Sequence, residues 1–331
     1  MREMRGTQLQ KLLDVEAFFM EINMKKKWKI QSLLELYKCI NVNEKGFEKA
    51  LAEKDKYYGN LINIPKKNGY REICAIDKSC ELYRIQRNLK RNFLDNIMIS
   101  DIAYGFRKKS DYFDFLECHK SFYGSSNYLR IDISDFFGTI SRGLLEETFE
   151  YYVICSSKEE KEKIIESLLE ILLYNGKLIQ GTPLAPAVSN IIFRSIDIRI
   201  QRYCDKQGIA YSRYADDLLF SSEEGKVLNK DFCRTIERIL KSKGFSINYD
   251  KLRRTQNCIV LNGNIRLSRK KLKPVSRVLF YMERNRYERS ADWAKKYNEE
   301  MSKYINEKNV LIEKEDDLIN LLAGYRAFLI C

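Results

Sequence analysis

Metal-binding cysteine and histidine motifs are missing from this sequence of 331 residues. Its nine cysteines stand singly, with no Cys-x-x-Cys pair, and His119 is its one histidine. Structural zinc sites need several such ligands at short spacings, so a zinc-binding module is excluded. No signal peptide is visible, and we therefore expect the cysteines to be reduced thiols of a cytoplasmic protein.

Long hydrophobic runs are also absent. No apolar segment reaches the roughly 18 residues that a membrane-spanning helix needs, so no membrane partner is expected. The few prolines and glycines, 4 and 15 respectively, leave little room for a disordered linker, and no internal repeat is present. A chain of this length can bury a substantial core in one large domain or in about two or three subdomains.

Positive charge dominates the composition. Lysine and arginine total 59 against 46 acidic residues, a formal net charge of +13, and 12% of the residues are aromatic. Such a balance indicates a polyanionic partner, nucleic acid before an anionic membrane surface. Aromatic rings among basic residues add faces on which bases stack. The basic, aromatic segment 104–109 contains three candidate contacts of this kind: Arg107, Lys108 and Lys109.

Two adjacent acids, Asp216 and Asp217, stand between apolar runs in the segment 211–220. The pattern predicts a strand, a tight turn with the carboxylates, and a second strand. Neighbouring carboxylates that are partly buried repel each other, which is costly unless a divalent cation binds there. Mg²⁺ suits such oxygen ligands and usually takes one or two carboxylates together with substrate phosphates. An isolated Asp-Asp pair is more often a solvated turn, so this interpretation depends on the rest of the chain.

A third acid, Asp132, ends a strand predicted over 127–133. Alternation places Asp132 and Arg130 on one face of this strand and the apolar Ile131 and Ile133 on the other. Two acids from a turn and one from a neighbouring strand can bridge a pair of metal ions about 3.5–4 Å apart. A capping or turn role for a lone aspartate remains the common alternative.

The remaining pattern is mostly helical. Apolar spacing predicts helices within 1–55, over 79–98, within 143–174, from the proline-containing loop at 180–186 to about residue 204, over 226–243 and within 274–331. Two Asn-Gly hairpins are predicted over 57–77 and 258–267, and a further strand over 245–251. The tip of the first hairpin carries Lys66, Lys67 and Arg71, where a basic tip can reach a phosphate-bearing substrate.

Four motifs, in order and spacing, resemble those of bacterial reverse transcriptases of the retron and defence-associated group. Residues 214–217 read Tyr-Ala-Asp-Asp and are identical to the YADD box, and 132–137 fit the first metal-binding motif of the palm. Residues 180–190 resemble the QGxxxSPxxxN segment, and Asn248-x-x-Lys251 fits the lysine-bearing palm strand. The resemblance covers about residues 55–331.

The resemblance implies an α+β fold, the right-hand polymerase, with fingers, a palm built on an antiparallel sheet and a helical thumb. The expected parts are N-terminal helices at 1–55, fingers at 56–126, a palm at 127–258 with finger helices 143–175 inserted, and a thumb at 259–331. The expected palm strands lie at 127–133, 211–223 and 245–252.

The resemblance also implies roles for individual residues. Asp132, Asp216 and Asp217 would be catalytic and would hold two Mg²⁺ ions, with Mn²⁺ as an alternative, together with the main-chain carbonyl of Ile133. The nucleotide site would comprise Lys66, Lys67, Arg71, Phe137, Gln180, Gly181 and Lys251. Within it, Phe137 would exclude a ribose 2′-hydroxyl, and Lys251 would act as a general acid or as a charge near the pyrophosphate. Asn190 and Tyr214 would contact nucleic acid beside the basic segment 104–109.

The function implied is RNA-directed DNA synthesis from dNTPs in a bacterial cytoplasm. A non-coding RNA would serve as the template and could also supply the primer; DNA would be the product. Antiphage defence, with a separately encoded effector protein, is the expected setting. Two alternatives stay open: template-independent or protein-primed DNA synthesis, and a non-catalytic RNA-binding scaffold. His119, the remnant of an NAxxH segment, is expected either to contact structured RNA or to be buried.

Overall fold

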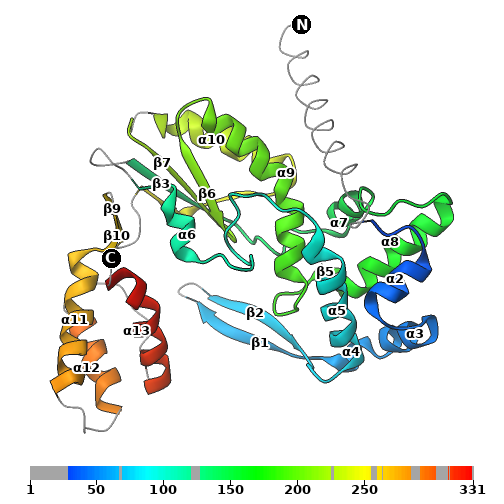
Figure 1. Cartoon of the computed structure of the whole chain (residues 1–331), viewed down its shortest axis with the longest axis horizontal. Helices are drawn as coiled ribbons and strands as arrows, with labels where there is room; N and C mark the ends of the chain where they lie inside the picture. Colours follow the sequence, from blue (N-terminus) through cyan, green and yellow to red (C-terminus); the bar gives the residue numbers. More distant parts are fainter. Residues whose placement is uncertain are drawn as a thin grey trace, which may run out of the picture.

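The computed structural model describes residues 29–66, 69–120, 127–224, 227–254, 259–262, 264–284, 291–302, 312 and 314–329. Figure 1 shows a central antiparallel sheet with N-terminal helices on one side and a group of C-terminal helices on the other. Residues 1–28, part of the predicted N-terminal helices, lie outside the described residues.

The central sheet has four strands in the order β6-β7-β3-β8. These are β6 (Ala210–Tyr214), β7 (Asp217–Ser222), β3 (Asn127–Ile133) and β8 (Ile247–Arg253), and every neighbouring pair is antiparallel. The strands predicted at 127–133 and 211–223 are therefore confirmed, and the third begins two residues later than the predicted start at 245. Ile131 and Ile133 are buried in the main core, as the alternation predicted.

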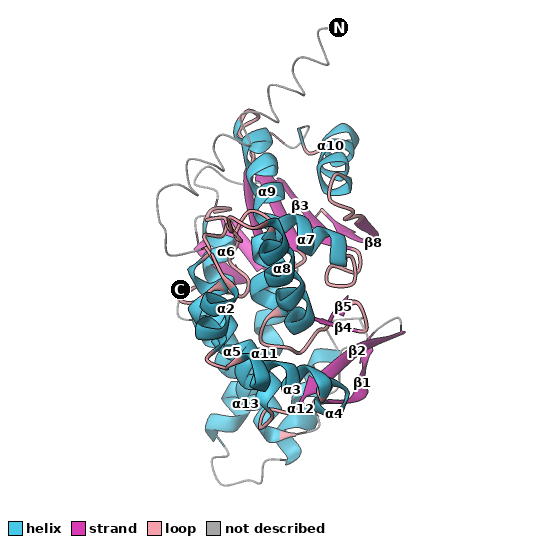
Figure 2. Cartoon of the chain, turned by 90° about the vertical axis from the view of Figure 1, so that its right-hand side faces the viewer, coloured by secondary structure: helices cyan, strands magenta, loops and turns pink. Residues whose placement is uncertain are grey.

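Two helices share the main core with this sheet. They are α9 (Ala185–Asp205) and α10 (Lys230–Lys241), and Phe193 and Phe232 from them join Phe220 of β7 in the same apolar cluster. Figure 2 shows α9 beside the sheet, with α7 (Arg142–Phe149) below it. A proline in its first turn helps to start α9, because a proline there loses no intrahelical hydrogen bond. The predicted end near residue 204 is confirmed.

Short capped helices form the N-terminal side. Ser32 caps α2 (Leu33–Ile40), and Asn43 caps α3 (Glu44–Ala52), each through a side-chain oxygen that accepts a backbone N–H. A single turn, α4 (Lys54–Tyr57), then leads into the first hairpin. The helical prediction for this region is confirmed over its described part.

The predicted Asn-Gly hairpin is present as β1 (Tyr58–Lys66) and β2 (Gly69–Ile76). Its register pairs Lys66 with Gly69 and Ile64 with Arg71, so both basic residues belong to strand ends near the tip. Lys67, the third basic residue predicted there, lies outside the described residues. The hairpin is a two-stranded sheet of its own, apart from the central sheet in both views (Figures 1 and 2).

Three predicted helices are shorter than expected. The helix predicted over 79–98 is α5 (Glu81–Asn92) followed by the 3-10 turn η2 (Leu94–Asn96), because the backbone of Phe93 leaves the helical region between them. The helical pattern at 143–174 contains α7 (Arg142–Phe149) and α8 (Lys158–Leu172), followed by a small hairpin of β4 (Leu173–Tyr174) and β5 (Lys177–Leu178). The helix predicted from 226 starts at Lys230, since Asn229 caps it.

A hairpin and three helices form the C-terminal part. The hairpin comprises β9 (Ile259–Asn262) and β10 (Asn264–Leu267), and the helices are α11 (Arg269–Arg284), α12 (Ala291–Ser302) and α13 (Glu315–Leu329). Three helices were predicted within 274–331, and the first starts five residues earlier. They enclose a small core of their own around Val278 and Trp293. Ile265 packs instead against the short helix α6 (Tyr112–Glu117) and β7.

The state of the cysteines and the character of the helices can be compared with the expectations from composition. All six cysteines whose side chains are described are free thiols: Cys39, Cys80, Cys118, Cys155, Cys204 and Cys233. Within the described part of the chain, no helix combines the length and the apolar character that crossing a membrane requires.

Candidate active site

The two acids of the YADD segment lie at a tight turn between β6 and β7. The register pairs Tyr214 with Asp217, so Ala215 and Asp216 are the two residues of the turn. Ala215 has φ 57°, in the left-handed region that costs an alanine roughly 1–2 kcal/mol. The predicted strand-turn-strand pattern is confirmed, and the surroundings must hold the turn in this conformation.

The sheet register brings the third acid next to this turn. Asp132 of β3 is the cross-strand partner of Asp217 on β7. One residue further on, the N–H of Ile133 donates to the carbonyl of Asp216 over 2.9 Å. Directly opposed residues have Cβ atoms about 4.5–5.5 Å apart. The three predicted acids thus meet at one end of the central sheet, although 84 residues separate Asp132 from Asp216 in sequence.

Two side chains of β8 contact Asp132. Nζ of Lys251 lies 2.8 Å and 3.0 Å from the two carboxylate oxygens, and the amide of Asn248 donates to one of them over 3.2 Å. Asn248 is also the cross-strand partner of Asp132. The Asn-x-x-Lys segment predicted to serve the site therefore reaches the first acid with both of its named residues. Asp132 itself is only 8% exposed.

Arg130 holds the carboxylate of Asp217. Its Nε donates to Oδ1 over 3.0 Å and its Nη2 pairs with Oδ2, a two-pronged contact between half-buried groups. The alternation of the predicted strand put Arg130 on the same face as Asp132, but no function was predicted for Arg130. The alternation of β3 was the available signal, because a charged residue two positions before a candidate catalytic acid shares its face.

Asp216 differs from the other two acids in its electrostatics. Burial, followed by the charges of Asp217 and Asp132, raises the pKa of its carboxyl above the usual value. An ionised Asp216 therefore costs folding free energy at neutral pH. A divalent cation bound among the three carboxylates would offset that cost, and oxygen donors of this type suit Mg²⁺.

The carboxylates do not surround a common point as their side chains stand. Over the described residues, no group of three aspartate, glutamate, histidine or cysteine side chains is arranged to hold a metal ion. Two of the three acids instead point to protein cations, Asp132 to Lys251 and Asp217 to Arg130. The donor chemistry fits the predicted Mg²⁺ ions, and the side chains would have to reorient to bind them.

Three of the predicted nucleotide residues have described surroundings away from Asp132: Phe137, Gln180 and Gly181. Phe137 is half-buried, with its ring 5.2 Å from Phe136 and 6.2 Å from the exposed ring of Phe106. Gln180 is half-buried and Gly181 exposed, just before α9; Gly181 has φ 102°, a conformation that favours glycine. Their contacts with nucleotide stay a prediction, as do those of Lys66, Lys67 and Arg71.

The basic segment 104–109 packs beside the turn. The N–H of Tyr104 donates to the carbonyl of Arg213 over 2.8 Å, which adds this loop to the free edge of β6. Arg107 and Lys108 are exposed and form surface ion pairs with Asp101 and Asp95, at 3.5 Å and 2.8 Å. Such surface pairs contribute little to stability. The loop that carries these exposed basic side chains thus packs beside the strand that leads into the Ala215–Asp216 turn.

Two residues predicted to contact nucleic acid, Asn190 and Tyr214, make contacts within the protein. Asn190 is 1% exposed, and its amide donates to the carbonyl of Gly105 over 2.9 Å. It therefore supports the 104–109 loop from α9, and this structure gives it no exposed surface for nucleic acid. Tyr214 is half-buried, with its ring packed edge-on against Tyr112 at 5.3 Å. Direct contacts of either residue with nucleic acid stay a prediction.

Known proteins match this chain over most of its length. A family model described as reverse transcriptase (RNA-dependent DNA polymerase) matches residues 64–277. The chain is 28% identical over 226 residues to the retron Ec86 reverse transcriptase of Escherichia coli, covering 65% of this chain and 67% of the relative. For the Escherichia coli retron Ec48 enzyme the identity is 27%, with 67% and 55% covered. For the Myxococcus xanthus retron Mx162 enzyme it is 24%, with 57% and 43% covered.

The chain thus spans from under half to two thirds of the length of these relatives. Among solved structures, it is similar to telomerase from Candida albicans, at 13% identity and a TM-score of 0.43 over 86% of this chain and 61% of that one. Apo telomerase from Candida tropicalis aligns with 11% identity and a TM-score of 0.43, covering 74% and 52%. Because the family model matches more than half of the chain, the resemblance predicted from the motifs is confirmed, and the chain belongs to the reverse transcriptase family, the RNA-dependent DNA polymerases, with retron enzymes as relatives.

Proposed function

We propose that the chain extends a primer 3′-hydroxyl with dNTPs opposite an RNA template, using the site at Asp132, Asp216 and Asp217. One observation carries this proposal: the register of β3 and β7 sets Asp132 opposite Asp217, with Asp216 in the adjoining turn. Adjacent half-buried acids lower the stability of the fold because their charges repel each other. A polymerase site that binds two metal ions would explain why the acids lie together. Membership of the reverse transcriptase family supports the same reaction.

Three carboxylates and the carbonyl of Ile133 would hold two Mg²⁺ ions. When bound, these ions would supply the charge that activates the primer hydroxyl and stabilises the leaving pyrophosphate. Mn²⁺ would serve as an alternative ion. The protein's own task is then to place its groups and to supply fixed charge at the site.

Lys251 and Phe137 would act on the incoming nucleotide. The ammonium group of Lys251, which pairs with Asp132 here, would turn to the pyrophosphate as a charge or as a proton donor. The ring of Phe137 would block a ribose 2′-hydroxyl, so that dNTPs are preferred over rNTPs. Lys66, Lys67 and Arg71 would grip the triphosphate, and Gln180 with Gly181 would line the new base pair.

The division into parts follows from this assignment. We propose fingers at 56–126, a palm at 127–258 with 143–175 inserted, and a thumb at 259–331, with residues 1–55 packed against the fingers. The separate core of α11–α13 supports an independent thumb. Similarity to retron reverse transcriptases favours a dedicated non-coding RNA as the template, a DNA product and a setting in phage defence beside an effector protein.

The experiment is purification from the native locus, followed by sequencing of the nucleic acid that accompanies the protein. The wild-type protein is compared with Asp216→Asn/Asp217→Asn and with Asp231→Asn, a control on an exposed carboxylate of α10. We expect a defined RNA with all three proteins, and DNA complementary to it with the wild type and the control alone.

Other outcomes would assign the chain differently. DNA without a matching RNA, or DNA joined covalently to the protein, would indicate template-independent or protein-primed synthesis. RNA binding with no DNA from any of the proteins would indicate a non-catalytic scaffold. DNA from the doubly substituted protein would exclude the proposed site.

A further inference from the structure

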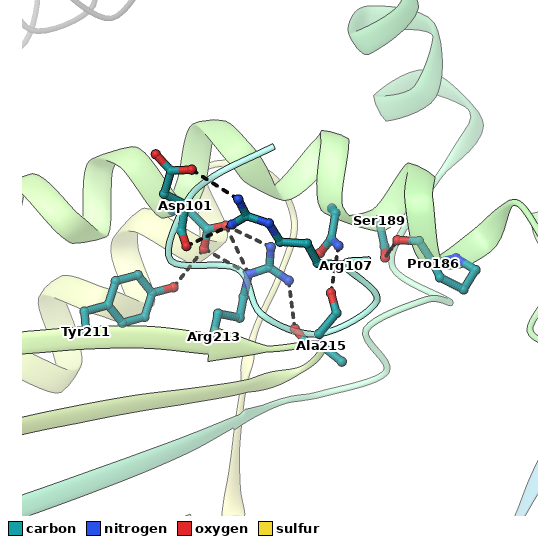
Figure 3. A network of polar contacts seen from close by, with 10 residues as sticks. Asp101, Arg107, Pro186, Ser189, Tyr211, Arg213 and Ala215 are labelled. Atoms are coloured by element: carbon teal, nitrogen blue, oxygen red, sulfur yellow. Dashed lines mark hydrogen bonds and ion pairs between the residues drawn. The ribbon is translucent and has the colours of Figure 1, made fainter. Parts of the chain in front are cut away.

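A buried ion pair lies directly behind the Ala215–Asp216 turn. Arg213 of β6 and Asp197 of α9 are both 0% exposed. Nε of Arg213 lies 2.9 Å and 3.1 Å from the two carboxylate oxygens, and Nη2 lies 2.8 Å from one of them. The hydroxyl of Tyr211 donates to the same carboxylate over 2.9 Å (Figure 3). Both carboxylate oxygens therefore accept hydrogen bonds from protein groups.

The guanidinium also donates a hydrogen bond to the turn. Nη1 of Arg213 donates to the carbonyl of Ala215 over 3.0 Å (Figure 3). That carbonyl belongs to the peptide group between Ala215 and Asp216. Because the guanidinium is planar and its Nε and Nη2 are held by Asp197, this bond sets the orientation of the peptide that carries Asp216.

A second connection runs from α9 to the same turn. Asn190 holds the carbonyl of Gly105, and the backbone of Gly105 is so close that a Cβ atom there would lie 2.4 Å from the nitrogen of Ala215. Asn190 and Asp197 are seven residues apart and so lie on one face of α9. Phe193, between them, lies under the guanidinium, with its ring centroid 4.6 Å away. One face of α9 thus supports the turn through two residues, Asn190 by way of Gly105 and Asp197 by way of Arg213.

Stability alone does not explain a charged pair in this position. Well-packed apolar residues can replace a buried ion pair at little or no cost in stability. Apolar residues could not, however, hold the carbonyl of Ala215. The left-handed backbone of Ala215 would relax without a partner that fixes its peptide group.

We propose that Arg213 and Asp197 are positioning residues, which orient the Ala215–Asp216 peptide and so fix where the Asp216 carboxylate lies relative to Asp132 and Asp217. They touch neither substrate nor metal, and they act through the turn. This inference rests on the proposed function of the three acids. Polar groups that orient metal ligands in this way typically contribute roughly 10- to 100-fold to metal affinity or activity.

The test is an apolar replacement of the whole pair, Asp197→Leu/Tyr211→Phe/Arg213→Met, which leaves no unpaired charge. The control, Lys54→Met/Glu170→Leu, removes an ion pair that joins α4 to α8 away from the acids. The measurements are the melting temperature, Mn²⁺ binding by electron paramagnetic resonance, hydrogen exchange of the peptide that covers 211–218, and kcat and KM for dNTP in DNA synthesis.

We expect the triple variant to melt within a few degrees of the wild type, to bind Mn²⁺ roughly 10- to 100-fold more weakly and to exchange faster at the turn. Its kcat should fall by a similar factor, while KM for dNTP changes little. The control should match the wild type in every respect. Wild-type Mn²⁺ affinity, turn exchange and kcat in a folded triple variant would overturn the proposal.

Arg213→Lys covers the case in which the triple variant does not fold. A lysine at this position keeps a positive charge beside the carboxylate of Asp197. Its single nitrogen, however, cannot hold both that carboxylate and the carbonyl of Ala215. We expect it to fold and to show the same loss of Mn²⁺ affinity and faster exchange at the turn; wild-type values for both would overturn the inference. If the wild type neither binds Mn²⁺ nor makes DNA, it is the proposed function that fails, whereas an active wild type with unaffected variants refutes only the positioning role.

Discussion

His119 shows how far one residue could be interpreted from its sequence position. It was expected either to contact RNA or to be buried, and it is buried between two serines. Its Nδ1 lies 2.7 Å from the hydroxyl of Ser221, and its Nε2 lies 2.7 Å from the hydroxyl of Ser212. The hydroxyl of Ser212 also donates to the carbonyl of Phe115 over 2.8 Å, so it accepts from Nε2–H, and Nδ1 accepts from Ser221. The histidine therefore joins α6 to the central sheet as a neutral ring.

Its burial predicts a loss of stability in acid. Burial lowers the pKa of His119 to about 3, whereas an unfolded histidine titrates near its ordinary value of about 6.5. The unfolded state thus binds more protons between these values, and stability falls as the pH drops below about 6.5. From this residue we expect a loss of about 2 kcal/mol between pH 7 and pH 5.

The measurement is urea unfolding of the wild type and of His119→Gln at both pH values. Glutamine keeps a donor for Ser212 but does not titrate, so this variant should show a smaller decrease in the free energy of unfolding. Equal decreases in the two proteins would mean that His119 is not the group responsible.

Among the elements, the sequence predicted those with strong local patterns. The β6–β7 turn, the Asn-Gly hairpin of β1 and β2, and the long helix α9 each follow from periodicity and turn residues within one segment. The docking of the 104–109 loop onto the free edge of β6 could not be predicted, because it joins segments more than 100 residues apart. The same holds for Arg130 and Arg213, whose partners are identified only once the sheet register and α9 are in place.

A substitution at Gly105 tests how tightly the 104–109 loop packs against the turn between β6 and β7. A Cβ at Gly105 would lie 2.4 Å from the nitrogen of Ala215, a backbone atom that cannot move without displacing the Ala215–Asp216 turn. We expect Gly105→Ala to cost roughly 1–3 kcal/mol in the free energy of unfolding and to reduce DNA synthesis further than that loss explains.

Gly143→Ala is the matched control. A Cβ atom at Gly143 would meet no neighbouring atom within 4 Å, and the residue lies in α7, where alanine favours the helix. This variant should be as stable as the wild type or more so, with unchanged activity. Thermal melts and primer extension measure both effects, and similar behaviour of the two variants would contradict tight packing at the turn.

For the whole molecule, charge is the property that follows most directly from composition. The net charge of +13 predicts that RNA is bound mainly through its phosphates, with release of counterions. If about 6–10 phosphates are contacted, affinity should fall on the order of 10³-fold or more between 50 and 200 mM salt. Fluorescence anisotropy with a labelled RNA hairpin measures this slope, and an affinity that barely changes with salt would contradict it.

The arrangement of the parts was predictable only through resemblance. Composition and periodicity indicate a basic, mixed helical and stranded chain, but they do not show that α11–α13 form a core of their own. Nor do they show that β10 contacts α6, since Ile265 and Phe115 are 150 residues apart. Such contacts depend on the tertiary structure, which no local pattern specifies.

The ion pairs of Lys251 with Asp132 and of Arg130 with Asp217 bear on how the protein is made and stored. Two of the three acids have their charge balanced by side chains of the same sheet, so we expect the fold to assemble without a divalent ion. Treatment with EDTA should therefore stop DNA synthesis while it leaves the melting temperature within about 2 °C of its starting value, and Mg²⁺ should restore activity without a refolding step. A melting temperature that drops steeply with the chelator, measured by differential scanning fluorimetry, would show instead that the ions are part of the fold.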